Sequence, residues 1–509
     1  MPVGATCIVR QGKAVAMAAV TRLPMDDFRR RIAQEVAGRR SLMAFFGVPE
    51  LGGVVRLLAV LGNRDRGELE LLSSEARDAY PALTPECPQA GSFEREIAEQ
   101  YGLEPQGHPW LKPVRFQRPE PGAPSVHGAD GAQPQPPFPG VQEFFTVAGP
   151  GVHEVAVGPI HAGIIEPGHF RFQCDGEKVL HLEIALGYQH RGVERALVGG
   201  PSKRTIHQME TLAGDTTIGH ATAYCLALEA LAGCEAPPRA QSLRAVALEL
   251  ERLAGHTGAL GALAQDIGFL PTASFCGRLR GDFLNLTATL CGSRFGRGML
   301  RPGGVGFDLS AALVVDCLQR LDTLRHDVSG AVRLLFETSA VRGRFENIGT
   351  LPYDTCMQLG MVGPTARASG LAIDARRDFP SGAWRVLEVP VATCAEGDVY
   401  ARAQLRWQEM QTSLDLIRRL LEELPAGSLR AEIGSLRPEA VAVSVVEGWR
   451  GEVCHVASTD AAGAFARYKV VDPSFRNWAG LSMAMRQQQI SDFPLCNKSF
   501  DLSYCGHDL

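Results

Sequence analysis

The feature that most constrains this chain is a segment rich in proline, glycine and glutamine near the end of its first quarter. Residues 118–140 read RPEPGAPSVHGADGAQPQPPFPG and offer few side chains that a core would bury. Such a composition is typical of a semi-rigid tether between domains. With 509 residues, the chain is long enough for more than one core. We therefore expect a domain over residues 1–118, a linker over 119–140 and a second domain over 141–509.

The first domain has the pattern of a small α/β unit. Two strand-like runs, Val54–Val60 and Glu68–Ser73, flank a Gly-Asn-Arg-Asp-Arg-Gly turn and predict a hairpin. Ser92 is the expected N-cap of a short helix that ends at Gly102.

The second domain is dominated by helical periodicity. Its apolar residues recur at intervals of three and four, with arginine and glutamate on the opposite face. The predicted helices are Ile218–Ala232, Gln241–Leu263, Ser310–Phe336 and Tyr400–Leu424. The predicted strands are Glu154–Val157, His169–Cys174, Lys178–Ile184 and Val441–Glu447. The expected fold class is therefore α+β, with a helical bundle and one small sheet in the second domain.

Charge and hydropathy exclude several functions. The formal net charge is -5 and no long basic run is present, which argues against nucleic-acid binding. No apolar run approaches the roughly 18 to 20 residues of a membrane span, so the chain is expected to have no transmembrane segment of its own. The first residues, MPVGATCIVRQGKAV, lack the pattern of a secretory signal, which predicts a cytoplasmic location.

The cysteines are scattered. There are 13 of them, with no CxxC pair to begin a zinc or iron–sulfur site, and we expect them to be reduced. The sequence also lacks the GxGxxG, GxxxxGK[ST] and GxSxG motifs. If NAD takes part in the chemistry, it is expected to bind to another polypeptide.

Several ordered motifs of the second domain resemble those of a known family. They are Gly158-Pro159-Ile160-His161, Glu166–Arg171 (EPGHFR), His190–Glu194 (HRGVE), His220-x-x-Ala-Tyr224 and Gly363–Gly370 (GPTARASG). This set resembles the large subunit of group 4, membrane-bound nickel–iron hydrogenases of the formate-hydrogenlyase type. It is similar, more distantly, to the quinone-site subunit of respiratory complex I, the forty-nine-kilodalton subunit of NADH-quinone oxidoreductase. An ion pair is the expected role of Glu194, and the resemblance places Arg367 beside Asp374 as a fixed charge.

The first domain carries a second resemblance. Phe93–Glu96 (FERE), Tyr101–Leu103 (YGL) and Gly107–Pro109 (GHP) occur in the order found in the thirty-kilodalton subunit of complex I and its hydrogenase counterpart. The resemblance therefore implies a fused chain, in which a domain like the thirty-kilodalton subunit precedes a domain like the quinone-site subunit.

The metal ligands of these hydrogenases are missing. Four thiolates, two from each of two CxxC motifs, hold nickel and iron in the family, because soft metals need anionic sulfur ligands. When the motifs are aligned, Ala213 and Thr216 take the first pair of positions, and Ser503 and Gly506 take the second pair. We therefore expect no metal bound by this chain.

A polar pocket for quinone or another redox substrate is still expected where the loop, the helix opening and the C-terminal tail meet. The tyrosine position of the complex I quinone site falls on Gly214, so the familiar quinone donors are absent or displaced. The candidate pocket residues are His161, Glu166, His169, Asp215, Thr216, His220, Arg367, Ser503 and Tyr504.

By resemblance, the chain would be a subunit of a membrane-associated oxidoreductase complex, peripheral to the cell membrane. Its partners would be a small iron–sulfur subunit similar to the twenty-kilodalton subunit of complex I and, through it, antiporter-like membrane subunits. An iron–sulfur cluster would lie in the partner. Two alternatives remain open: an active hydrogenase large subunit, and a non-catalytic scaffold that couples its neighbours.

Overall fold

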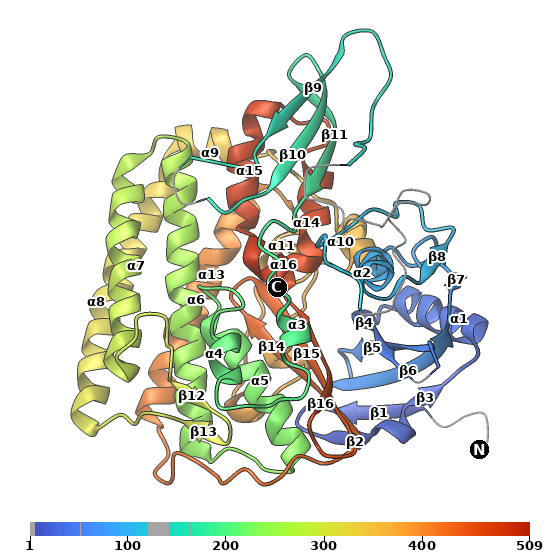
Figure 1. The fold of residues 1–509 in the computed structure, drawn as a ribbon. Coiled ribbons are helices and arrows are strands. Elements are labelled where there is room, and N and C mark those ends of the chain that lie inside the picture. Colours follow the sequence, from blue (N-terminus) through green and yellow to red (C-terminus); the bar gives the residue numbers. More distant parts are fainter. Residues whose placement is uncertain (1–5, 51, 121–141, 163–164) are drawn as a thin grey trace.

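The computed structural model describes residues 6–50, 52–120, 142–162 and 165–509. Helices and sheets are mixed throughout, which confirms the α+β class (Figure 1). The predicted linker falls mostly on residues 121–141, which lie outside the described ranges, so the domain boundaries remain a prediction.

The first part of the chain forms a sheet in the order β1-β6-β5-β4, with β3 parallel to β6. The strands are β1 (Cys7–Arg10), β3 (Thr21–Arg22), β4 (Ser41–Pro49), β5 (Val55–Asn63) and β6 (Glu68–Ala76). Helices α1 (Met25–Ala37) and α2 (Gly91–Tyr101) pack against it (Figure 1). The predicted hairpin is confirmed, because β5 and β6 pair antiparallel from Val55↔Ala76 to Asn63↔Glu68.

The start of α2 differs from the prediction. The helix begins at Gly91 and no side chain caps it, so Ser92 is not its N-cap. A short 3₁₀ helix over Pro88–Ala90 runs directly into α2 and occupies the place where a capping residue would stand. The predicted end is correct, because Gly102 adopts a left-handed conformation there with a φ of 67°.

A bundle of long helices forms the other side of the molecule (Figure 1). It consists of α6 (Pro238–Asp266), α7 (Leu270–Cys291), α8 (Ala311–Glu337) and α13 (Val399–Glu422), and α5 (Thr217–Ala232) packs on the neighbouring sheet. The four predicted helices are confirmed. We did not predict α7, whose sequence carries Pro271, Gly277 and Gly281 and so has a low helix propensity.

The strands of the second part form two larger sheets, which corrects the prediction of one. Strands β9 (Val152–Val157), β10 (His169–Asp175) and β11 (Lys178–Ala185) make the first. The second has the order β16-β15-β14-β2 and contains β14 (Ala440–Gly448), β15 (Gly451–Thr459), β16 (Phe465–Val471) and β2 (Ala14–Ala16). Strands β14 and β15 are buried along their whole length.

The remaining elements are short. They are α3 (Val193–Ala196), α4 (Thr205–Met209), α9 (Ser339–Phe345), α10 (Tyr353–Leu359), α11 (Gly363–Arg367), α12 (Ala375–Asp378), α14 (Pro473–Ala484), α15 (Phe493–Phe500), α16 (Tyr504–Asp508), β7 (Ala79–Pro81), β8 (Glu104–Gln106), β12 (Leu300–Arg301) and β13 (Gly304–Val305). Across the described residues, none of the helices has the length and apolar character needed to cross a bilayer.

Strand pairing, hydrogen bonds and an ion pair connect the first quarter of the chain to the rest. Strand β2 pairs with β14, and the Gln11 amide exchanges two hydrogen bonds with the backbone of Val445, at 2.5 and 3.0 Å. The Lys469 ammonium lies 2.6 Å from the Glu96 carboxylate, and both side chains are buried. These contacts hold the C-terminal sheet in a fixed place relative to α2.

Candidate functional site

Three segments far apart in the sequence meet at one place, here called the junction: residues 165–169, 213–220 and 503–508. Arg191 links the last of them to the residue just before the second, because its Nη2 donates to the carbonyl oxygens of Cys505, at 3.1 Å, and Leu212, at 2.8 Å. Gly168 lies against the Tyr504 ring, and a Cβ atom at Gly168 would stand 2.7 Å from Cε1 of Tyr504. The structure therefore brings the C-terminal tail to the opening of α5 and to the β9–β10 loop.

The two histidines of the β9–β10 loop contact its backbone. Nε2 of His161 lies 2.9 Å from the carbonyl oxygen of Gly168, and Nδ1 of His169 lies 3.3 Å from that of Gly158. Burial lowers the pKa of His169. Its Nε2 is buried and finds no hydrogen-bond partner within the described part of the chain. His161 thus holds the loop closed, whereas His169 keeps one ring nitrogen free.

Glu166 faces the start of α16. Burial raises the pKa of the Cys505 thiol to about 11, and the charge of Glu166 adds to the shift. Burial likewise raises the pKa of Tyr504 to about 12, again with a contribution from Glu166. Cys505 is therefore a protonated thiol near neutral pH, the form that binds metals poorly.

The side chains of the four residues that the resemblance aligns with the family's metal ligands do not fit a nickel–iron centre. Ala213 and Gly506 have no donor atom. Thr216 Oγ1 accepts a hydrogen bond from Arg450, at 3.3 Å, and Ser503 Oγ accepts one from the backbone N–H of Gly506, at 2.9 Å. A Cβ atom at Gly506 would lie only 2.7 Å from Cγ of Asp472. Neutral hydroxyls already engaged in hydrogen bonds cannot replace thiolates around soft metals.

An ion pair occupies the space beside Thr216. The Arg450 guanidinium lies 2.5 and 2.8 Å from the two carboxylate oxygens of Asp215, and it stacks 3.9 Å from the centre of the Trp449 ring. Burial opposes ionisation of Asp215, but the charge of Arg450 outweighs it and lowers the pKa of Asp215. Asp215 is therefore a fixed anion whose two oxygens are already bound.

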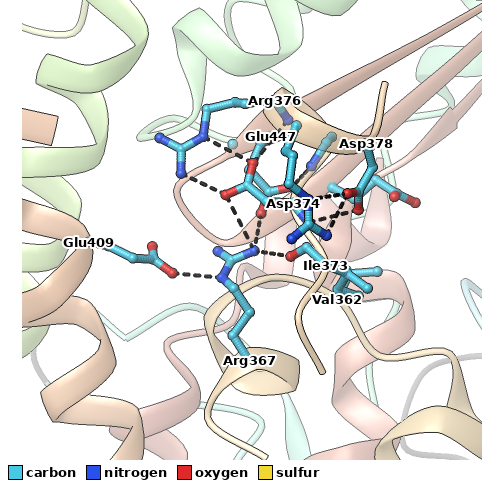
Figure 2. Close-up of polar contacts among 12 residues, drawn as sticks. Val362, Arg367, Ile373, Asp374, Arg376, Asp378, Glu409 and Glu447 are labelled. Carbon is cyan, nitrogen blue, oxygen red and sulfur yellow. Dashed lines mark hydrogen bonds and ion pairs between the residues drawn. The ribbon is translucent and has the colours of Figure 1, made fainter. Parts of the chain in front are cut away.

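Arg367 contacts none of the junction residues through its ion pairs (Figure 2). Its Nε lies 2.7 Å from Glu409, and its Nη1 lies 2.8 Å from Glu447. Asp374 lies 3.9 Å from Arg367, beside it as expected, but Asp374 pairs more closely with Arg376, at 2.6 Å.

These residues belong to a larger buried set, here called the charged core, in which carboxylates and guanidiniums face each other. Its members are Glu249, Arg252, Arg367, Asp374, Arg376, Glu409 and Glu447. Burial raises the pKa of Glu447 to about 7 although Arg367 opposes the shift, and the nearby charge of Asp374 adds to it. The charged core ties α6, α11, α12, α13 and β14 together.

The two larger cavities of the described chain lie mostly outside the junction, and one junction residue, His507, lines the second of them. One of about 1010 Å³ is lined by Lys13, Arg66, Trp384 and Arg437, among others. Another, of about 630 Å³, is lined by Trp110, Phe475 and Trp478, among others. Of the nine candidate pocket residues, Asp215 alone lines one of the four prominent cavities of the described residues, a small space of about 20 Å³.

Sequence reasoning missed two acidic residues of this region. Glu251 accepts the backbone N–H groups of Ile218, at 2.6 Å, and Gly219, at 3.1 Å, at the start of α5. Burial raises the pKa of Glu251 to about 8, and the charge of Asp215 contributes. Asp472 lies against Gly506 and contacts His220, with Oδ2 3.0 Å from Nε2. The signal for Asp472 was its place before Pro473, where an aspartate caps a helix.

Comparisons with known proteins agree with this arrangement of motifs. The family described as "Respiratory-chain NADH dehydrogenase, 49 Kd subunit" matches residues 266–436. The chain is 33% identical over 354 residues to the carbon monoxide-induced hydrogenase of Rhodospirillum rubrum, covering 69% of this chain and 97% of that protein. It is 31% identical over 454 residues to formate hydrogenlyase subunit 5 of Escherichia coli (strain K12), covering 84% and 77%. With NADH-quinone oxidoreductase subunit 4 of Thermus thermophilus it shares 29% over 372 residues, covering 68% and 91%. The chain therefore belongs to the family that unites this subunit of NADH dehydrogenase with the related hydrogenase subunits.

Proposed function

We propose that this chain is a subunit of a membrane-associated oxidoreductase complex of the complex I and hydrogenase type, and that it works there without a nickel–iron centre of its own. The observation that carries the proposal is the donor set at the junction. Ala213, Thr216, Ser503 and Gly506 supply no thiolate. Arg450 and Asp472 occupy the surroundings of two of these positions.

The same proposal assigns the chain a redox substrate at the junction, with quinone as the candidate class. Support comes from His169, whose Nε2 is a buried ring nitrogen without a partner in the described residues, and from Glu166 beside Tyr504. Relatives are named as NADH-quinone oxidoreductase subunits. NAD, if the complex uses it, binds to another subunit.

The partners follow from the same relatives. One is named a formate hydrogenlyase subunit and another a membrane-bound hydrogenase subunit. We infer a small iron–sulfur subunit seated against the junction, with membrane-embedded antiporter-like subunits beyond it. On this proposal the chain lies on the cytoplasmic face of the membrane and is attached through its partners.

Purification of the intact complex tests the proposal. A tag on this chain would be used to isolate the complex, and nickel and iron would be measured by mass spectrometry beside the formate hydrogenlyase complex of Escherichia coli as a nickel-containing control. We expect no stoichiometric nickel, and reduction of decylubiquinone or methyl viologen without hydrogen turnover. One nickel per chain with hydrogen evolution would instead establish an active hydrogenase. An intact complex whose acceptor reduction is unchanged by His169→Ala would favour a scaffold.

A further inference from the structure

A row of four buried polar side chains extends away from the junction. Asp472 Oδ2 lies 3.0 Å from His220 Nε2, His220 Nδ1 lies 3.1 Å from His455 Nε2, and His455 Nδ1 lies 2.9 Å from the Tyr468 hydroxyl. All four residues are at most 1% exposed. They come from the start of α14, from α5, from β15 and from β16, and we call them the histidine row.

Both nitrogens of each imidazole take part in this row. A neutral imidazole donates through one nitrogen and accepts through the other, so a proton received on one side can be released on the other. Burial holds the pKa of His455 well below its usual value, and the neighbouring His220 adds to the shift. Burial raises the pKa of Asp472, but the hydrogen bond with His220, with a contribution from Arg450, outweighs burial and lowers that pKa. The row thus combines a carboxylate with a neutral imidazole at His455.

One end of the row lies at the junction. Asp472 stands where a side chain on Gly506 would be, and its carboxylate also accepts the backbone N–H of Ser474, at 2.7 Å. A proton on Asp472 would therefore be available at the place where the family's chemistry occurs.

The other end leads toward the surface. The Tyr224 ring centre lies 6.4 Å from that of Tyr468, and Thr205 lies near the Tyr224 hydroxyl. Thr205 Oγ1 in turn accepts the backbone N–H of Ser202, at 2.9 Å, and Ser202 is exposed. The step between the two tyrosines is the longest, and a bound water or a rotation of a side chain must complete it.

Tyr468 belongs to a large apolar core, although the charged Arg450 and Glu194 also face the row. Ala221, Val453, Phe465 and Val470 belong to the same buried cluster as Tyr224 and Tyr468. Polar groups in such a core cost free energy unless each is hydrogen-bonded, and apolar residues of similar size would fill the space equally well. A continuous line of satisfied, titratable groups is what proton transfer requires.

We propose that Asp472, His220, His455 and Tyr468 form a proton relay between the junction and the surface near Ser202. The proposal rests on the proposed function, because it supplies protons to a reduction at the junction. In the inward direction the Tyr468 hydroxyl gives its proton to His455 Nδ1, and His455 passes its Nε2 proton to His220 Nδ1. His220 then releases its Nε2 proton to Asp472, which donates it, and Tyr468 is reprotonated from outside. One proton moves and the row returns to its starting charge, with both imidazoles in the other tautomer, so each ring must rotate or exchange its proton before the next transfer.

Two substitutions test the relay in the purified complex, with decylubiquinone or methyl viologen as the acceptor. His455→Gln keeps a hydrogen-bonding side chain but cannot pass a proton, and Tyr468→Phe removes one hydroxyl. We expect His455→Gln to lower turnover by about tenfold or more and to increase the solvent deuterium isotope effect. We expect Tyr468→Phe to act in the same direction. His256→Gln, which removes an equally buried histidine outside the row, is the matched control and should leave the isotope effect unchanged.

The pH profile of turnover is the second readout, because a merely structural role would not change it. The titratable and charged groups that face the row are Arg450, Glu194, Tyr224, Cys225 and Cys454. None of them is altered by the two substitutions. If both variants keep the turnover, pH profile and isotope effect of the wild type, the relay is wrong and the proposed function stands. A wild-type complex that reduces no acceptor would remove the proposed function and the relay together.

Discussion

The charged core and the junction are both buried and polar, yet they differ in how their groups are satisfied. In the charged core, carboxylates such as Glu409 and Glu447 face guanidiniums at salt-bridge distance. At the junction, the family's ligand positions hold an alanine, two hydroxyls and a glycine, and the nearby Cys505 is kept as a thiol. The difference teaches that the charged core is stabilised by charges of opposite sign, whereas the four aligned positions at the junction hold neutral groups, two of which are hydrogen-bonded.

The largest effect is expected when one buried guanidinium is removed from the charged core. Arg367→Met would leave Glu409 and Glu447 buried without their guanidinium, at an expected loss of about 3–5 kcal/mol in the free energy of unfolding. Urea unfolding of the purified complex, followed at this chain, would measure it. Arg278→Met removes a half-exposed guanidinium paired with Asp282 and Asp327, and should change stability by less than about 1 kcal/mol. Equal losses in the free energy of unfolding for both variants would mean that burial does not increase the contribution of these ion pairs to stability.

The second test asks whether the junction has room for a metal ligand. Gly506→Cys restores the residue type that a metal site would need, but its Cβ would press on Asp472, and we expect a loss of about 1–3 kcal/mol. Gly214→Cys is the control, because a Cβ atom there meets nothing within 4 Å. A Gly506→Cys variant as stable as Gly214→Cys would show that the junction can accept a thiol. Thermal unfolding separates the two results.

The third test uses pH. Because the pKa of Glu251 is about 8 in the folded state and near 4.5 when unfolded, the folded state binds more protons between these values. Stability should therefore fall as pH rises from about 5 to 8. These two pKa values alone would give a fall of roughly 3–4 kcal/mol, but the Glu251 side chain is partly exposed and screened by solvent. We therefore expect Glu251→Gln to remove roughly 1–2 kcal/mol of the fall, measured by urea unfolding at both pH values. The exposed Glu423→Gln serves as the control, and an unchanged slope in Glu251→Gln would show that Glu251 is ionised in the folded protein.

The smallest expected effect is at the cap of α16. Ser503 Oγ accepts the backbone N–H of Gly506, so Ser503→Ala should cost about 1 kcal/mol, the usual value of an N-cap, whereas Ser503→Asp should retain the cap. Differential scanning calorimetry of both variants would measure this difference in stability. If Ser503→Ala is neutral, the hydroxyl has a role other than capping.

The long helices could be predicted from the sequence because their periodicity is a local property. Helices α5, α6, α8 and α13 all begin and end within a few residues of the predicted bounds. Strands β15 and β16 were missed, because β15 is buried on both faces and so lacks the alternation that marks a half-exposed strand.

Only the parts of the site that lie in family motifs could be predicted from the sequence. Family resemblance indicated that the tail and the opening of α5 meet, but it could not identify ion-pair partners distant in sequence. An ion pair was expected for Glu194 in its own turn, and the structure pairs it with Arg467, at 2.8 Å, and Lys469, at 3.0 Å, on β16. His455 gave no signal, because a single histidine within a buried strand is more often a packed core residue.

The pairing of β2 with β14 has a consequence for synthesis. Ala16, near the beginning of the chain, pairs with Ala440, which is made only when most of the chain has been synthesised. At about 5–20 residues per second, a ribosome needs about 20 to 85 s to make the second strand after the first. During that time the edge of β2 and the Gln11 amide have no partner from β14, so the nascent chain presents an open strand edge of the kind that chaperones protect. Completion of this sheet, and with it the seating of Lys469 on Glu96, therefore comes long after β2 has been made.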